Sequence, residues 1–198
     1  MRAWPALVTL VLLASGCAPT RVAPPATVED PVSVHLLDHG RHSSLVLPSA
    51  SPATWIRYSY GDWRFYVERD TGFGAALGAL LRPSPAALGR QVLHGPDFGT
   101  VLTTQIRVPI HEVLSLEVPR TRADRLRDGL EELWEREQDS RHEAPAWEMS
   151  FVNHPAPYTL WHNSNRMVAR WLEEMDVAVS RAPILSRWAL EEPASDAP

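Results

Sequence analysis

Apolar and polar positions alternate early in the chain with the period of a β-strand. From Val32 to Leu37 the even positions hold Val, Val and Leu, so one face of the segment is more apolar than the other. The sequence Asp-His-Gly at 38–40 then supplies the chemistry of a turn. A second strand is predicted over 44–47. It ends at Pro48, because proline cannot continue a strand ladder.

Further strands are predicted along the chain. Residues 55–60 and 64–68 have the pattern of a hairpin, joined by the Gly-Asp-Trp sequence at 61–63. Residues 101–108 and 113–118 are two more strand candidates, with a proline between them. The aromatic residues within the predicted hairpin could stack on a sugar or a peptide. We expect them to fill a core instead, as hairpin aromatics more often do; they are Trp55, Tyr58, Tyr60, Trp63 and Tyr66.

Two helices are predicted from apolar residues at helical spacing. The first has Thr121 as its expected N-cap and Asp124 in its first turn, and the second begins near Ser164. A shorter apolar stretch over 72–81 is a third helix candidate despite its three glycines. Strands grouped early and a strong helix late predict an α+β fold, with a mainly antiparallel sheet and packed helices. The apolar faces consist of Leu126, Leu130, Leu133 and Trp134 in the first helix, and Met167, Val168, Trp171, Leu172 and Met175 in the second.

The N-terminal residues have the order of a bacterial lipoprotein signal. Arg2 gives a cationic start, an apolar run follows over 6–14, and small residues lead to Cys17. The apolar run is too short to span a bilayer. We therefore expect residues 1–16 to be a signal peptide and Cys17 to carry a diacylglyceryl thioether, so that membrane lipid is the partner at this end. An ordinary signal peptide, with Cys17 after the cut by chance, is the alternative.

The expected signal also predicts where the protein resides and how it is organised. Ala18 stands where Asp would indicate inner-membrane retention, so we expect a cell-envelope protein on the periplasmic face of the outer membrane. Residues 17–30 are rich in proline and predict a tether, which could hold the domain up to roughly 40 Å from the lipid. A single domain is expected over 31–190, followed by a disordered tail over 191–198. Since Cys17 is the only cysteine, the exported domain has no internal disulfide.

Composition narrows the classes of partner and cofactor. The formal net charge of −5 argues against nucleic acid, because phosphate binding needs a basic surface. The glycines between 72 and 78 do not have the spacing of a dinucleotide fingerprint, so we expect no cofactor. A zinc site would need three or four convergent ligands, and no HExxH or Cys/His framework is present. We therefore expect no metal, although the histidines that could contribute are His35, His39, His42, His94 and His162.

Reactive groups gather in two short sequences. The first, His-Gly-Arg-His at 39–42, opens a predicted strand, and the second, Asn-Ser-Asn at 163–165, opens a predicted helix. A helix start has unpaired N–H groups that could stabilise a nucleophile and a developing oxyanion. A histidine on a neighbouring strand could accept the proton, and Asp62 or a backbone carbonyl could orient the imidazole. The alternative is that these residues are only caps and turns.

Four segments, in this order, resemble the uncharacterised bacterial family catalogued as domain of unknown function 2459. They are HGRHSSLVLP at 39–48, YSYGDWRFYVE at 58–68, LLRPSP at 80–85 and WHNSNRMVARWL at 161–172. Typical members read approximately HGWHTGLVLP, FGWGDRGFY, a (W/R)PSP-like element and NTCNTWTARAL. More remotely, a histidine strand followed by a cysteine-bearing helix resembles circularly permuted papain-like folds of the NlpC/P60 kind. That resemblance implies a thiol hydrolase or acyltransferase acting on amide or ester bonds, commonly in cell walls or lipids.

The resemblance assigns roles to three positions. The family's strand histidine falls on His42, its Gly-Asp pair on Gly61 and Asp62, and its helix-opening cysteine on Ser164. Serine needs strong general-base help that a thiol does not. We therefore expect a degenerate cleft that binds or scaffolds a cell-wall or lipid ligand, and that is inactive or attenuated as an enzyme. One alternative is a serine-dependent amide or ester hydrolase with Ser164 as nucleophile, His42 as base and Asp62 as orienter. Another is an interaction module with no active-site ancestry.

Overall fold

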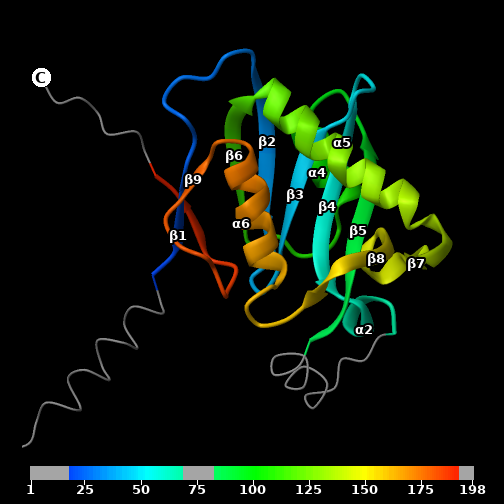
Figure 1. The fold of residues 1–198 in the computed structure, drawn as a ribbon. Coiled ribbons are helices and arrows are strands. Elements are labelled where there is room, and N and C mark those ends of the chain that lie inside the picture. The colour runs from blue at the N-terminus through cyan, green and yellow to red at the C-terminus, as the bar shows by residue number, and fades with distance from the viewer. Residues whose placement is uncertain (1–17, 69–82, 192–198) are drawn as a thin grey trace, which may run out of the picture.

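A seven-stranded antiparallel sheet forms the centre of the molecule (Figure 1). The computed structural model describes residues 18–68 and 83–191. Helices pack on the sheet, so the α+β class with a mainly antiparallel sheet is confirmed. In the order β6-β2-β3-β4-β5-β8-β7, the strands are Glu112–Pro119, Pro31–Asp38, Ser43–Pro48, Thr54–Asp62, Ser84–His94, Met149–Tyr158 and His142–Ala144.

Two helices, α5 (Arg120–Arg136) and α6 (Ser164–Glu174), cover one face of the sheet (Figure 1). Their apolar residues pack against alternate residues of the central strands, such as Leu45 and Tyr58, to form the main core. Both predicted helices are thus confirmed, although α5 begins one residue before the expected cap and Pro119 at its N-cap makes no side-chain bond. Tyr58, Tyr60 and Tyr66 are buried, which confirms the core assignment of these aromatic residues.

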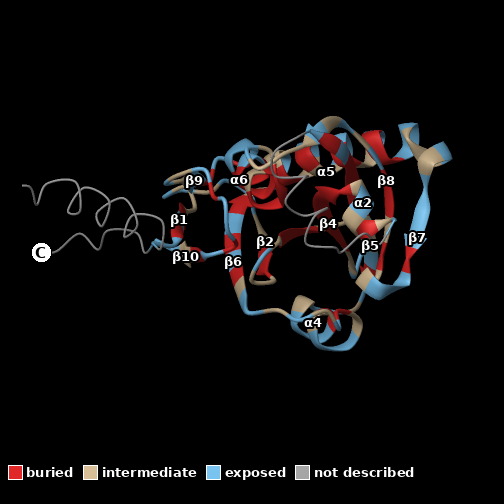
Figure 2. Cartoon of the chain, turned by 90° about the horizontal axis from the view of Figure 1, so that it is seen from below, coloured by how far each residue is buried: buried red, intermediate tan, exposed pale blue. Residues whose placement is uncertain are grey.

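Helix α4 (Phe98–Gln105) lies on the other face, where Figure 2 shows it separated from α5 and α6 by the sheet. Its Val101 joins a second core with Val46, the neighbour of Leu45 that faces the opposite way. The strand predicted over 101–108 is therefore wrong. Asp97 explains the helix: its carboxylate accepts from the backbone N–H and the hydroxyl of Thr100, and this cap overrides the β-branched composition.

The hairpin predicted over 55–60 and 64–68 is also wrong. Strand β4 continues to Asp62, and a short helix α2 (Trp63–Tyr66) follows it. The true partner of β4 on that side is β5, which the sequence analysis missed. Two 3-10 turns, η1 (Gln138–Ser140) and η2 (Pro145–Trp147), flank β7. The helix expected over 72–81 lies outside the described residues.

A small second sheet joins the two ends of the described chain. Strand β1 (Thr20–Ala23) pairs in parallel with β10 (Trp188–Leu190) and antiparallel with β9 (Ala178–Val179). Val22 of β1 is fully buried and belongs to the main core. Part of the expected 17–30 tether is therefore a strand of the domain. The expected signal peptide, Cys17 and residues 192–198 lie outside the described residues. Among the helices that the structure describes, none is both long and apolar enough to span a membrane.

Candidate functional site

His42 and Ser164, which are 122 residues apart in sequence, meet at one end of the main sheet. His42 directly precedes β3, and Ser164 is the first residue of α6. The Oγ atom of Ser164 lies 3.5 Å from Nδ1 of His42, at the outer limit of a hydrogen bond. Asn163 caps α6 by accepting from the backbone N–H of Arg166. The structure therefore brings together the two residues predicted as base and nucleophile.

Ser164 is less exposed than a nucleophile that attacks a substrate needs to be. The residue is only 1% exposed. An attacking hydroxyl must come within reach of a substrate carbon as well as of its base. In the described structure, the Ser164 hydroxyl contacts the imidazole of His42 but is buried away from solvent.

The imidazole of His42 is neutral near pH 7. Burial, with a smaller contribution from the Arg41 guanidinium, lowers the pKa of His42 from 6.5 to about 4. Its ring packs near Phe65 and Tyr66, with centroids 5.6 and 5.9 Å away. Among the described residues, no hydrogen bond to Nε2 fixes the ring from its other side. His42 thus has the charge state of a proton acceptor without an orienting group.

Asp62 has a structural role at the end of β4. Its Oδ1 accepts from the backbone N–H of Phe65 and so caps α2, while Oδ2 accepts from the hydroxyl of Ser84 on β5. No hydrogen bond or ion pair joins Asp62 to His42 in the part of the chain that the structure describes. The third predicted site residue therefore holds the local fold and does not contact the imidazole.

Asn165 is the residue that holds β3 and α6 together. Its Nδ2 donates to the carbonyls of Arg41 (3.2 Å) and Ile184 (3.1 Å), and its Oδ1 accepts from the hydroxyl of Ser43 (2.9 Å). Asn165 and Ser43 are both buried. The sequence analysis named Asn165 only as a neighbour of Ser164, although a second Asn in a helix-opening Asn-Ser-Asn sequence was the available signal.

A second histidine and serine lie next to this site. Nδ1 of His39 donates to the carbonyl of Pro109 (2.8 Å), so its Nε2 accepts from the hydroxyl of Ser44 (2.9 Å). Burial is the main cause that lowers the pKa of His39 to about 4, and the Arg57 guanidinium lowers it further. Ser44 sits within β3, opposite Ser59 of β4. From sequence, His39 was expected as part of the reactive segment at 39–42 and as a possible metal ligand, but its pairing with Ser44 was not expected.

A cavity of about 270 Å³ opens on the α4 side of the sheet, and His42, which contacts Ser164, is among its lining residues. Its walls include His39, Ser44, Arg57 and Ser59 from the sheet region. Apolar side chains close the cavity from the 108–109 segment and from η2. No carboxylate belongs to its described lining. This cavity could not be predicted from sequence, because its walls come from segments far apart along the chain.

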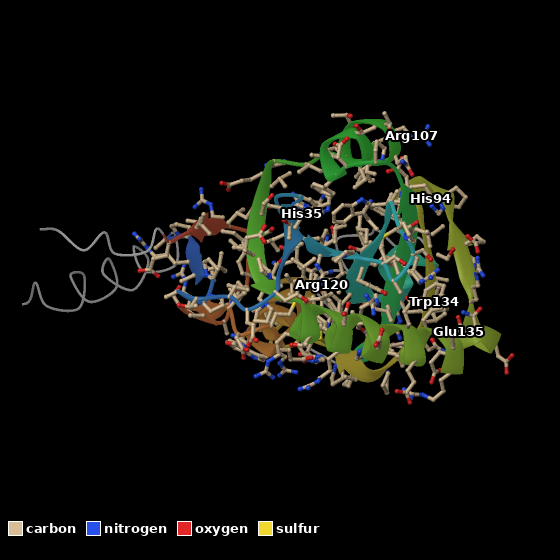
Figure 3. The ribbon with its side chains drawn as sticks, turned by 90° about the horizontal axis from the view of Figure 1, so that it is seen from above. His35, His94, Arg107, Arg120, Trp134 and Glu135 are labelled. Carbon is tan, nitrogen blue, oxygen red and sulfur yellow. The ribbon has the colours of Figure 1, made fainter. Side chains whose placement is uncertain are left out.

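The histidines considered as metal ligands have separate partners. His35 stacks on Phe98 at 3.6 Å between ring centroids and bonds to Ser115. Figure 3 shows His35 and His94 well apart across the sheet. His162 bonds to the hydroxyl of Tyr60. Over 18–68 and 83–191, no three His, Cys, Asp or Glu side chains converge in a set that could hold a metal ion.

No family model, no curated protein and no solved structure matches this chain.

Proposed function

We propose that this protein is an envelope lipoprotein, anchored through Cys17, whose permuted papain-like cleft binds a ligand and does not hydrolyse it. Ser164 stands where thiol relatives would carry cysteine. The observation that carries this proposal is the geometry at Ser164: its Oγ lies 3.5 Å from Nδ1 of His42, yet the residue is only 1% exposed. The pair has the arrangement of a base and a nucleophile, while the hydroxyl is closed to solvent.

Two further observations support binding over catalysis. The carboxylate of Asp62 bonds to Phe65 and Ser84, so it does not orient the imidazole of His42. The lining of the open cavity includes His42 but not Ser164. A ligand in the cavity would touch the imidazole before it met the hydroxyl.

The second candidate is a serine-dependent amide or ester hydrolase, and the contact between Ser164 and His42 favours it. In that reaction Nδ1 of His42 would take the hydroxyl proton while Oγ of Ser164 attacks the carbonyl carbon. The proton would then pass to the leaving amine or alkoxide, and water would release the acyl group. The low pKa of His42 keeps the imidazole neutral, as a base must be, but also makes it a weak base.

Covalent labelling distinguishes the two candidates. The full-length protein, purified in detergent, is treated with a fluorophosphonate probe, and we expect no labelling above that of Ser164→Ala. Ser186→Ala, at another buried serine, is the matched control. Labelling of the unaltered protein that disappears in both Ser164→Ala and His42→Ala, but persists in Ser186→Ala, would establish the hydrolase and overturn the proposal.

A thiol at position 164 tests the burial directly. We expect Ser164→Cys to react with iodoacetamide at least about tenfold more slowly than Ser51→Cys, because Ser51 is exposed and position 164 is buried. The unaltered protein corrects for any thiol at Cys17. Alkylation of Ser164→Cys faster than the exposed control would mean an accessible and activated position, which contradicts a closed cleft.

The anchor has its own test. Cells that produce the protein are fed an alkyne analogue of palmitate, and we expect label on the protein together with its recovery in the membrane fraction. Cys17→Ala should lose both. Label that survives in Cys17→Ala would contradict lipidation at this residue.

A further inference from the structure

Arg57 is a buried cation that forms no ion pair with any residue that the structure describes. It lies in the middle of β4, it is only 4% exposed, and it lines the 270 Å³ cavity. Its NH1 group donates to the neutral side chain of Gln91 at 2.8 Å. Its Nε has no hydrogen-bond partner, and no carboxylate of the described residues forms an ion pair with it.

This arrangement is unfavourable in the free protein. An ionised group removed from water needs pairing and hydrogen bonds, and an unsatisfied one destabilises the fold. Burial lowers the pKa of Arg57 to about 10, so the guanidinium is still charged near pH 7. The Glu148 carboxylate raises the pKa of Arg57 through space, but it already bonds to Arg107 at 2.8 Å and to the backbone N–H of Val108. Glu148 thus offsets the charge of Arg57 only through space and forms no ion pair with it, so the positive charge in the cavity is only partly neutralised.

The other groups of the cavity suit an anion with an apolar body. Ser59 has only a weak acceptor, the sulfur of Met149 at 3.4 Å, so its hydroxyl can turn to donate to a ligand. His39 and His42 are held neutral and repel an anion less than carboxylates would. Trp147 and Met149 supply apolar wall. The volume is below that of most sites for drug-sized molecules, which indicates a small ligand.

We propose that this cavity binds a small monocarboxylate, whose carboxylate pairs with the guanidinium of Arg57. A planar guanidinium matches a carboxylate in a two-bond geometry. A single cation also neutralises a single negative charge, whereas a phosphate dianion would leave one charge buried. The apolar body would lie against Trp147 and Met149, with its polar end toward the sheet. This inference rests on the proposed ligand-binding function and names the chemical class of the ligand.

A free carboxylate could belong to a short aliphatic acid or to the C-terminus of a peptide. Hexanoate and N-acetylleucine represent these sources, and hexanamide is the uncharged counterpart of hexanoate. Each compound is titrated calorimetrically into the full-length protein in nanodiscs. We expect at least one of the two acids to bind. If hexanoate binds more tightly than N-acetylleucine, hexanamide should bind at least about tenfold more weakly than hexanoate. The tighter acid identifies the source.

Two variants with the same change in net charge locate the interaction. Arg57→Gln should weaken binding of the preferred acid at least about tenfold. Arg64→Gln removes an exposed arginine from the adjacent α2, outside the cavity lining, and should change the affinity less than twofold. Equal losses in the two variants would indicate general electrostatics and overturn the assignment to Arg57.

Thermal unfolding separates ligand binding from a structural role. Because Arg57 forms no ion pair with the described residues and its buried Nε lacks a hydrogen bond, we expect ligand-free Arg57→Gln to unfold at the same or a higher temperature than the unaltered protein. The preferred acid should raise the midpoint only when Arg57 is present. A variant too unstable to purify would show a structural cation and overturn the proposal. Hexanamide binding as tightly as hexanoate would also overturn it while leaving a ligand-binding cleft intact. Failure of every compound to bind would overturn this inference, whereas the proposed function is judged separately by the labelling of Ser164 and of Ser164→Cys.

Discussion

The hydroxyl of Ser43 donates a hydrogen bond of 2.9 Å to Oδ1 of Asn165 and so joins the first residue of β3 to the second residue of α6. His42 precedes Ser43, and Ser164 precedes Asn165. The contact between the imidazole and the hydroxyl is thus a consequence of the bond between their neighbours. The Nε1 group of Trp188 also donates to Oγ of Ser43, which connects this junction to strand β10.

This junction predicts that Asn165 matters more for stability than Ser164. Asn165→Ala removes three hydrogen bonds, one buried and two partly buried, and should lower the free energy of unfolding by at least about 2 kcal/mol. Ser164→Ala removes one long contact and should lower it by less than about 1 kcal/mol. Denaturant unfolding of the two neighbouring variants measures the difference. Equal losses would mean that the Ser164–His42 contact itself holds the two elements together.

Two glycines should respond oppositely to alanine. A Cβ at Gly61 would collide with the ring of Tyr66, which lines the cavity, so Gly61→Ala should destabilise the protein by about 1–3 kcal/mol. A Cβ at Gly129, within α5, would meet nothing within 4 Å, so Gly129→Ala should stabilise it by about 0.5–1 kcal/mol. Thermal unfolding gives both values. A neutral Gly61→Ala would show that the Tyr66 ring is free to move.

Stability should fall on acidification between pH 6.5 and 4. Burial lowers the pKa values of His35, His39 and His42 to about 4, whereas the unfolded chain takes up these protons near 6.5. The unfolded state therefore binds more protons in this window. Each histidine contributes stability that is present above pH 6.5 and is lost toward pH 4, at roughly 1.4 kcal/mol per unit of pKa difference.

The matched variants for this effect are His35→Asn and His142→Asn. His35 is buried under Phe98, whereas His142 is exposed on β7. The drop in unfolding temperature between pH 7 and pH 4.5 should be smaller in His35→Asn and unchanged in His142→Asn. The same drop in both variants would contradict a depressed pKa at His35.

Asp62 should act on stability through α2 and β5. Asp62→Ala removes the cap of α2 and leaves the buried hydroxyl of Ser84 without its acceptor, for a loss of about 1–3 kcal/mol in the free energy of unfolding. The exposed Asp139→Ala is the control and should stay within about 0.5 kcal/mol. An unaffected Asp62→Ala would show that these two bonds contribute nothing.

The sequence predicted the elements whose periodicity is unbroken. Strands β2 and β6 show alternation, β3 is a short apolar run that ends at a proline, and helices α5 and α6 have helical spacing; all five are present. The sequence did not reveal β5 and β8, since β5 contains Pro85 and Gly89, and β8 contains Pro155 and Pro157. Pairing with neighbouring strands overrides these weak local preferences. Around α4, a single aspartate cap outweighs several β-branched residues.

Only those parts of the candidate site that lie within short sequence segments were predictable. Helix-opening and strand-opening sequences pointed to Ser164 and His42, which the structure places in contact. The environment of Arg57 could not be predicted from sequence. The role of its charge can be judged only when the residues that line the cavity are known. Asp62 was misjudged for the same reason: a carboxylate after a strand looks alike in sequence whether it orients an imidazole or caps a helix.

Strand β1 begins three residues after Cys17 and is already held by β9 and β10. Three residues of fully extended chain span at most about 11 Å. A lipid on Cys17 would therefore hold the domain close to the lipid headgroups. The tether would be much shorter than the proline-rich sequence predicts.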